Sequence, residues 1–213
     1  ERVLSILEET PMVEEVPEND AGKQQPVMEF TGASARHVTF AYENEIILKD
    51  YSINLNPGKI IGIHGASGSG KSTLLKLLMR FWDVNQGTLE VNGSEIRQIP
   101  TRTLRDMESY VTQETHLFHD SIANNIAIGK PGASREEIVE AAKKASIHDF
   151  IQTLPDGYDT KVGELGDTLS GGEKQRIGIA RAFLHDAPFL LMDDCEIIGL
   201  TRRNPIKSRV LPC

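Results

Sequence analysis

The 213-residue sequence predicts an α/β fold that begins with an antiparallel β part and has a helical part inserted into its core. Three observations predict this fold. Short alternating runs mark residues 37–55 and 87–96, a glycine-rich loop joins an apolar run to an amphipathic helix, and a helical middle ends in a second apolar run. Strands that are covered on both faces are apolar throughout, so we expect both apolar runs to be buried core strands.

The first strands are marked by alternation and by turn residues. The run "HVTFAY" (37–42) alternates, and "ILKDYSINLNPGKIIGIHG" (47–65) supplies two more strands around a turn at Asn56-Pro57-Gly58. We expect the second of these, Ile60 to His64, to be buried on both faces because it is apolar throughout. In "GTLEVNGSEI" (87–96), Asn92-Gly93 stands between short alternating runs and predicts a tight hairpin.

Three helices are predicted from capping signals and apolar spacing. The first runs from Lys71 to about Phe81, with leucines at 74, 75, 77 and 78. The second begins after Ser134, because Glu137 completes a capping-box pattern three residues later. The third begins at "SGGE" (170–173), ends near Leu184 before a proline, and leads into the buried strand "FLLMD" (189–193).

Composition limits the classes of function. The net charge of −8 disfavours a nucleic-acid partner, because phosphate contacts need clustered Lys and Arg. The two cysteines, Cys195 and Cys213, are too few for a disulfide framework and fit a reducing compartment. No apolar stretch approaches the roughly 18–20 residues that span a bilayer, and the first residues lack the features of a signal peptide. We therefore expect a soluble chain that can still dock on a membrane partner.

The segment "GASGSGKST" (65–73) satisfies the phosphate-binding pattern G-x-x-x-x-G-K-[ST]. Glycines let successive N–H groups point at phosphate oxygens, and the following helix N-terminus adds partial positive charge. A flexible Gly/Ser-rich loop is the alternative, but the flanking apolar run and helix favour a P-loop NTPase (RecA-like) core that binds ATP with Mg²⁺. Lys71 would neutralise the β- and γ-phosphates and Ser72 would ligate Mg²⁺. The predicted nucleotide-binding residues here are Gly65, Ser67, Gly68, Ser69, Gly70, Lys71, Ser72 and Thr73.

Four further stretches resemble motifs of the nucleotide-binding domains of ABC transporters. "LSGGEKQR" (169–176) resembles the signature motif, with Glu173 where glutamine is commoner, and "YVTQETHLF" (110–118) resembles the Q-loop. "FLLMDD" (189–194) is similar to Walker B, and "FAY" (40–42) is similar to the A-loop. The order and spacing of the motifs agree with this family from about Val3 to Asp194.

The resemblance implies roles for individual residues. Asp193 would be the carboxylate that organises Mg²⁺, Gln113 would touch Mg²⁺ and the attacking water, and Tyr42 would stack on adenine. Gln113 can equally be a polar loop residue, and Tyr42 a strand aromatic packed in the core. The stretch "VGELG" (162–166) resembles a segment that contacts transmembrane coupling helices in exporters, which would make Glu164 the contact residue. Glu164 can equally be a solvated surface charge.

The signature stretch suggests a second phosphate-binding surface. Its hydroxyl and N–H groups would face outward at a helix N-terminus, from Ser170, Gly171, Gly172 and Glu173. A plain capping box between Ser170 and Glu173 is the alternative. One chain does not need two phosphate cradles for one nucleotide, so the resemblance implies a head-to-tail dimer in which this surface closes on ATP in the partner's P-loop.

Asp194 stands where this family normally has a glutamate that polarises the attacking water. Its side chain is one methylene shorter, and a displacement of about 1 Å at a reacting group can cost on the order of 10²-fold in rate. We therefore expect ATP binding with slow hydrolysis, so that this chain alone is a weak or inactive ATPase. "DDC" (193–195) also resembles the degenerate subunit of a heterodimeric exporter.

The predicted organisation is a connector from a missing transmembrane domain (1–26), an ABC nucleotide-binding domain (27–194, helical subdomain about 114–180) and an atypical tail (195–213). The resemblance ends after Cys195, so we expect a truncation or an altered reading frame that leaves the core incomplete. Similarity to exporters implies a place at the cytoplasmic face of the cell inner membrane, with a second nucleotide-binding domain and a transmembrane domain as partners. A non-hydrolysing regulatory ATP-binding module and a soluble ABC-type ATPase are the alternative functions.

Overall fold

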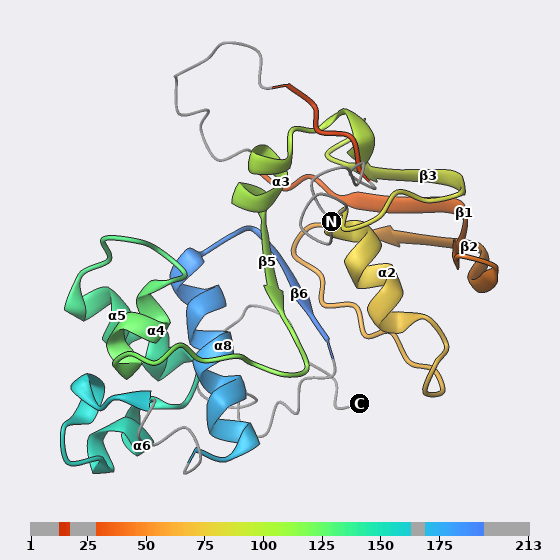
Figure 1. Ribbon diagram of the computed structural model, residues 1–213. Helices are drawn as coiled ribbons and strands as arrows, with labels where there is room; N and C mark the ends of the chain where they lie inside the picture. Colours follow the sequence, from red (N-terminus) through yellow and green to blue (C-terminus); the bar gives the residue numbers. More distant parts are fainter. Residues whose placement is uncertain (1–12, 18–28, 163–168, 194–213) are drawn as a thin grey trace, which may run out of the picture. The chain divides into compact units, whose positions relative to one another are not determined.

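The computed structural model describes residues 13–17, 29–162 and 169–193, which form two units (Figure 1). Unit 1 comprises residues 1–57 and 63–106, and unit 2 comprises residues 58–62 and 107–213. Each unit has a sheet and buried apolar side chains of its own. The predicted α/β fold with an antiparallel β part and a helical part is confirmed.

Unit 1 contains an antiparallel sheet with the strand order β2-β1-β3-β4. The central strand β1 (Ala33–Tyr42) pairs with β2 (Glu45–Leu55) and β3 (Gln86–Val91), and β3 also pairs with β4 (Ser94–Glu95). Asn92 and Gly93 join β3 to β4 with φ values of 53° and 77°, the two left-handed conformations that a tight hairpin turn requires. The hairpin predicted at Asn92-Gly93 is confirmed.

Helix α2 (Lys71–Leu78) begins at the predicted residue but ends before Phe81. The N–H of Arg80 donates to Leu77 O and the N–H of Phe81 donates to Lys76 O, both at 2.9 Å, while Arg80 has a φ of 50°. This bond pair is the Schellman motif, in which a left-handed residue turns the chain out of the helix. The predicted helix end near Phe81 was therefore wrong. The apolar residues continue to Phe81, but the left-handed residue Arg80 ends the helix before it.

The remaining elements of unit 1 are η1 (Ile96–Gln98) and α3 (Thr101–Met107). Its core combines sheet and helix side chains with almost no exposed surface, among them Val38, Leu77, Leu78, Val91 and Leu104. Burying each such side chain contributes roughly 1.5–3 kcal/mol. This core fixes α2, and therefore the loop that precedes it, against the sheet.

Unit 2 contains a parallel pair of strands, β5 (Glu108–Val111) and β6 (Phe189–Met192), which lie side by side in Figure 1. Its helical part consists of α4 (Ile122–Ala127), α5 (Arg135–Lys144), α6 (His148–Thr153), η2 (Gly157–Asp159) and α8 (Gly171–His185). One apolar cluster joins these helices to β5, and includes Val111, Ile122, Ile126, Ile147, Ile151 and Ile177.

The predicted helix starts of unit 2 are confirmed in detail. Ser134 and Ser170 each accept a hydrogen bond from the N–H three residues later, and Glu137 and Glu173 each accept one from the N–H of that serine. Helix α8 ends at His185, because Asp186 adopts a left-handed φ of 57° ahead of Pro188. The strand predicted over "FLLMD" is confirmed as β6.

The strand predicted from Ile60 to His64 is wrong. In the described part of the chain, no strand pairs with these residues, and Ile60 and Ile61 are 37% and 41% exposed. Apolar composition predicts burial, but a strand also needs a hydrogen-bonded neighbour. Among the described residues of unit 2, β5 and β6 pair with each other, and neither pairs with residues 60–64.

Candidate functional site

The phosphate-binding loop of residues 65–73, called the P-loop below, lies in unit 1 and leads into α2. Its residue Gly70 has a φ of 89° and precedes the first helical residue, Lys71. A Cβ atom at Gly70 would lie 2.8 Å from Leu48 Cδ2 and 3.2 Å from Ile47 O, both on β2. Glycine is therefore required here by backbone conformation and by the close approach of the sheet. The bond from Leu74 N–H to Gly70 O, at 2.9 Å, begins the helix directly after this turn.

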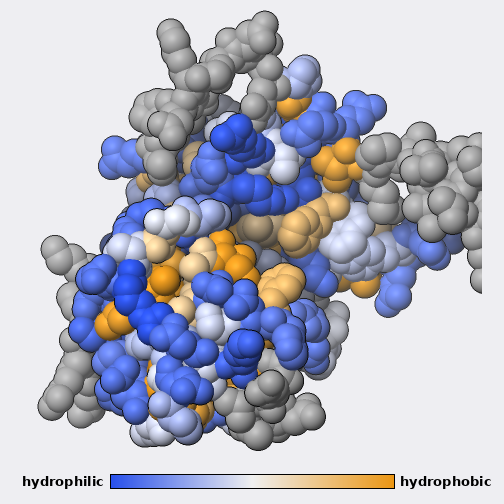
Figure 2. All heavy atoms as spheres, turned by 60° about the vertical axis from the view of Figure 1, so that its left-hand side comes forward, coloured by the Kyte–Doolittle hydropathy of each residue, from blue (hydrophilic) through white to orange (hydrophobic). Residues whose placement is uncertain are grey.

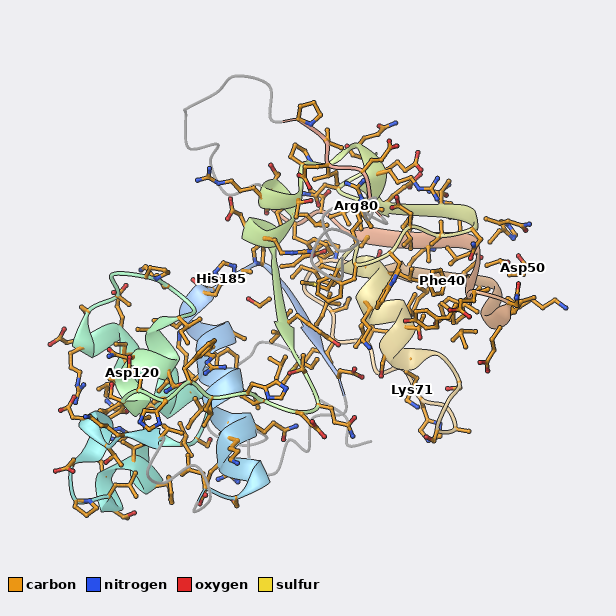
Figure 3. All side chains as sticks on the ribbon, in the orientation of Figure 1. Phe40, Asp50, Lys71, Arg80, Asp120 and His185 are labelled. Atoms are coloured by element: carbon orange, nitrogen blue, oxygen red, sulfur yellow. The ribbon has the colours of Figure 1, made fainter. Side chains whose placement is uncertain are left out.

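The Lys71 side chain folds back over the loop that precedes it. Its ammonium group donates to Gly65 O at 2.9 Å and to Ala66 O at 3.1 Å, and Ser69 N–H closes a turn on Ala66 O at 3.1 Å. Figure 3 labels Lys71 at the start of α2. The cation thus lies at the mouth of a loop whose N–H groups precede a helix N-terminus, an arrangement that suits an anion.

The other predicted P-loop residues differ in exposure. Ser67, Gly68 and Ser69 are exposed, Ser72 is half-buried, and Thr73 is buried within the first turn of α2. The exposed residues form the outer part of the loop, where a phosphate group can approach the backbone.

Tyr42, at the end of β1, belongs to an aromatic cluster in unit 1. Its ring meets Phe40 and Trp82 edge-on, with centroids 4.9 Å and 5.2 Å away, and Lys76 Nζ lies 6.0 Å from the Trp82 ring. Tyr42 remains half-exposed, so the structure makes it a packed strand aromatic with an accessible part. Trp82 was not among the predicted residues, although it is the only tryptophan and follows α2 closely in the sequence.

In unit 2, the two parallel strands bring Gln113 and Asp193 to the same edge of their sheet. Asp193 follows β6 directly, and its N–H donates to Val111 O, the last residue of β5, at 2.9 Å. Asp193 is only 7% exposed, and its Oδ2 accepts a hydrogen bond from the Tyr110 hydroxyl at 3.2 Å. Gln113 is exposed two positions after the end of β5. Carboxylate and amide oxygens at one sheet edge suit a hard cation.

Two residues that the sequence did not single out tie the Q-loop region to α8. Asn125 is fully buried on α4, and Arg181 of α8 donates to its backbone carbonyl at 2.7 Å and to its Oδ1 at 2.8 Å. Arg181 also donates to His116 O at 2.8 Å, and Asn125 Oδ1 accepts from Phe118 N–H at 2.8 Å. Burial lowers the pKa of the Arg181 guanidinium from its usual value. Residues 116–118 are thereby held by the helix that begins with the signature stretch.

The signature stretch forms the capping box described above, so this alternative is confirmed as local structure. The box uses the N–H groups of Ser170 and Glu173, and Lys174 N–H begins the helical ladder on Ser170 O at 3.1 Å. Gly171 and Gly172 are exposed, and a Cβ atom at either would meet nothing within 4 Å. The N–H groups of the first helical turn have no acceptor within the helix, so those of these glycines face outward.

The predicted ligands fit Mg²⁺ by their chemistry. Ser72 supplies a hydroxyl oxygen, Gln113 an amide oxygen and Asp193 a carboxylate, all of them hard donors. Across the described ranges of the chain, no group of three His, Cys, Asp or Glu side chains could hold a metal. The single carboxylate of Asp193 is compatible with Mg²⁺, which usually takes one or two carboxylates and fills its shell with water and phosphate oxygens.

Asp194 and Glu164 lie outside the described residues, as do both cysteines. The P-loop residues and Tyr42 belong to unit 1, whereas Gln113, Asp193 and the signature stretch belong to unit 2. Among the helices that the structure describes, none is long and apolar enough to cross a membrane.

Comparisons with known proteins agree on one family. The family model described as "ABC transporter" matches residues 48–196. A Haemophilus influenzae protein named "Probable ABC transporter ATP-binding/permease protein" is 52% identical over 194 residues, which cover 91% of this chain and 34% of that protein. The "ATP-dependent lipid A-core flippase" of Syntrophus aciditrophicus is 42% identical over 91% of this chain and 32% of its own.

A solved structure extends this agreement to the fold. The structure of a bacterial Atm1-family ABC exporter with ATP bound matches with a TM-score of 0.84 and 39% sequence identity, over 93% of this chain and 34% of that one. The chain therefore spans about a third of the length of the relatives it matches.

Proposed function

Because the chain belongs to the ABC transporter family, we propose that it is the nucleotide-binding domain of an exporter, in which binding and hydrolysis of ATP drive a substrate across a membrane. The observation that supports this most directly is the P-loop. Gly70 has a left-handed φ and a close contact with β2 that favour glycine, and Lys71 lies over the loop it follows. We propose residues 27–194 as this domain, residues 1–26 as a connector, and no function for residues 195–213.

Nucleotide binding would rearrange the Lys71 contacts. Its ammonium would exchange the carbonyl oxygens of Gly65 and Ala66 for phosphate oxygens, which are charged acceptors and bind it more strongly. When bound, Mg²⁺ neutralises charge that develops on the transferred phosphoryl group. Ser72, Gln113 and Asp193 are the proposed ligands, and Tyr42 is the proposed contact of the adenine ring.

The two signature glycines support a second copy of such a domain as partner. Neither has a left-handed φ, and neither would crowd a neighbour if it carried a Cβ. Nothing within the described chain therefore requires glycine at 171 or 172. Binding to a partner molecule would explain glycine at both positions. Without side chains there, the backbone N–H groups can approach the phosphates of ATP in the partner's P-loop.

Exposed apolar side chains on unit 2 support a transmembrane partner. Phe118 is 64% exposed and Ile128 is 48% exposed, and Figure 2 shows hydrophobic side chains at the surface among hydrophilic ones. The Haemophilus influenzae relative is named as an ATP-binding protein and a permease in one chain. We therefore place the domain at the cytoplasmic face of a membrane, next to a permease domain.

Nucleotide titration of the purified 213-residue chain tests the proposal. We expect it to bind the non-hydrolysable analogue AMPPNP with Mg²⁺ in calorimetry, and Lys71→Ala to weaken binding about 10- to 100-fold, since a charge-assisted contact is lost. Lys49→Ala, an exposed lysine on β2, is the matched control and should bind as the wild type does. Equal affinities for Lys71→Ala and the wild type would contradict the proposal.

Phosphate release separates the proposed exporter ATPase from a regulatory module. Slow but measurable release of phosphate from ATP, together with dimers in light scattering when Mg²⁺ and ATP are present, is the expected result. ATP-dependent dimers that release no phosphate at all would favour the non-hydrolysing module.

A further inference from the structure

Tyr110 and Asp193 are joined across the parallel sheet of unit 2. The Tyr110 hydroxyl donates to Asp193 Oδ2 at 3.2 Å, although the two residues are 83 positions apart in the sequence. Tyr110 lies on β5 and is paired with Leu191 of β6. Side chains two positions apart on a strand share a face, so Leu191 and Asp193 point to the side on which Tyr110 lies. The contact is set by the register of two paired strands.

The carboxylate that receives this bond is almost completely buried. Asp193 is 7% exposed, and its backbone N–H donates to Val111 O at 2.9 Å, directly after the last strand pair, Val111 and Met192. The side-chain torsion angles of Asp193 determine where its carboxylate oxygens point. A hydrogen bond to Oδ2 restricts that rotation.

We propose that Tyr110 is a positioning residue for the divalent cation that accompanies the nucleotide. It acts through Asp193, holding the carboxylate in the orientation that binds Mg²⁺, and does not itself touch the cation or the nucleotide. This inference rests on the proposed function. Partners that hydrogen-bond a metal-binding carboxylate orient it, and their loss typically weakens metal affinity about 10- to 100-fold.

The test uses the dissociation constant of MANT-AMPPNP for the 213-residue chain, measured by fluorescence in EDTA and in Mg²⁺. The constant in EDTA divided by the constant in Mg²⁺ reports how strongly the cation strengthens nucleotide binding. Because binding linkage is reciprocal, it also reports how strongly the nucleotide strengthens cation binding. We expect Tyr110→Phe to lower this ratio about tenfold, and to leave the constant in EDTA unchanged. Tyr51→Phe, which removes a hydroxyl from β2 in unit 1, should keep the wild-type ratio.

A double-mutant comparison distinguishes positioning from a general structural role. Asp193→Asn should lower the ratio further than Tyr110→Phe, and adding Tyr110→Phe to Asp193→Asn should change nothing more, since the acceptor is already altered. If Tyr110→Phe lowers the melting temperature, the comparison within the Asp193→Asn background still isolates the contact.

The outcomes that overturn the inference are distinct from those that overturn the function. If the wild-type ratio is above one and Tyr110→Phe has the same ratio, the inference is overturned and the proposed function stays intact. An equal loss in EDTA and in Mg²⁺ also overturns it, because the residue would then support folding only. A wild type that binds no nucleotide overturns the proposed function, and this inference with it.

Discussion

Arg80 joins the end of the P-loop helix to a segment near the start of the chain, because its Nη2 donates to Glu14 O at 2.7 Å. The same guanidinium donates to Ile99 O at 3.3 Å and pairs with Asp83 at 3.4 Å, and the side chain is buried. Figure 3 labels Arg80 at the end of α2 opposite to Lys71. Glu15, next to Glu14, accepts from Thr101 N–H and its hydroxyl, so residues 13–17 are attached at two points.

The first prediction concerns this attachment. Arg80 adopts a left-handed φ of 50°, which costs a residue with a Cβ roughly 1–2 kcal/mol, and its three contacts offset that cost. Arg80→Gly relieves the strain but removes the contacts, and we expect it to lower the free energy of unfolding by about 1–3 kcal/mol in urea denaturation. Arg80→Ala should lose about 1 kcal/mol more, because it keeps a Cβ.

Limited proteolysis gives an independent check of the same variants. Both should expose residues 13–17 to cleavage faster than the wild type, because the bond to Glu14 O is lost. An Arg80→Gly chain that is as stable and as resistant as the wild type would show that the guanidinium contacts contribute nothing.

The second prediction concerns the signature glycines. Gly171→Ala should leave the melting temperature unchanged or slightly raised, because a Cβ meets nothing within 4 Å and alanine favours helices. It should nevertheless abolish ATP-dependent dimers in light scattering, since the added methyl group lies where a partner's phosphates would approach. Gly132→Ala is not a suitable control, because Gly132 has a φ of 85°. Ala187→Gly, at a half-buried position after α8, provides one.

The third prediction concerns Asp194, which lies outside the described residues. If its short side chain limits hydrolysis, Asp194→Glu should raise the steady-state rate of phosphate release by on the order of 10²-fold. Affinity for the nucleotide should change little, because it depends on the P-loop. Equal rates for the variant and the parent chain would remove the basis for a weakened site.

The fourth prediction follows from Tyr158, which is buried against α6 and shares a hydrogen bond with His148 Nδ1 at 2.8 Å. Burial raises the pKa of Tyr158 to about 12, while the Arg135 guanidinium, 4.9 Å from the ring, opposes this shift. The folded state favours the neutral phenol, so its contribution to stability is fully present below pH 10 and is lost as the pH rises through about 12. Absorbance at 295 nm should show one tyrosine that ionises near pH 12, and Tyr158→Phe should remove it. A wild-type titration with all four tyrosines near pH 10 would contradict this assignment.

Much of the local structure could be predicted from short stretches of sequence. The capping boxes at Ser134 and Ser170, the turn at Asn92-Gly93 and the start of α2 depend on atoms within a few residues of each other. Such contacts join neighbouring residues, so residue type and spacing predict them. The P-loop residues were identified for the same reason, because their backbone geometry is local.

Other features depend on which distant segments meet. Arg181 and Asn125 are 56 positions apart and Tyr110 and Asp193 are 83 apart, and each pair exists because packing or strand register brings its members together. The unpaired residues 60–64 belong to the same class, since a strand needs a hydrogen-bonded neighbour. The sequence by itself thus determined the family, the P-loop and the helix starts, because these follow from neighbouring residues. The tertiary structure decided which side chains orient the Asp193 carboxylate and which acceptors hold Arg80, because free energies of burial and pairing are set by residues far along the chain.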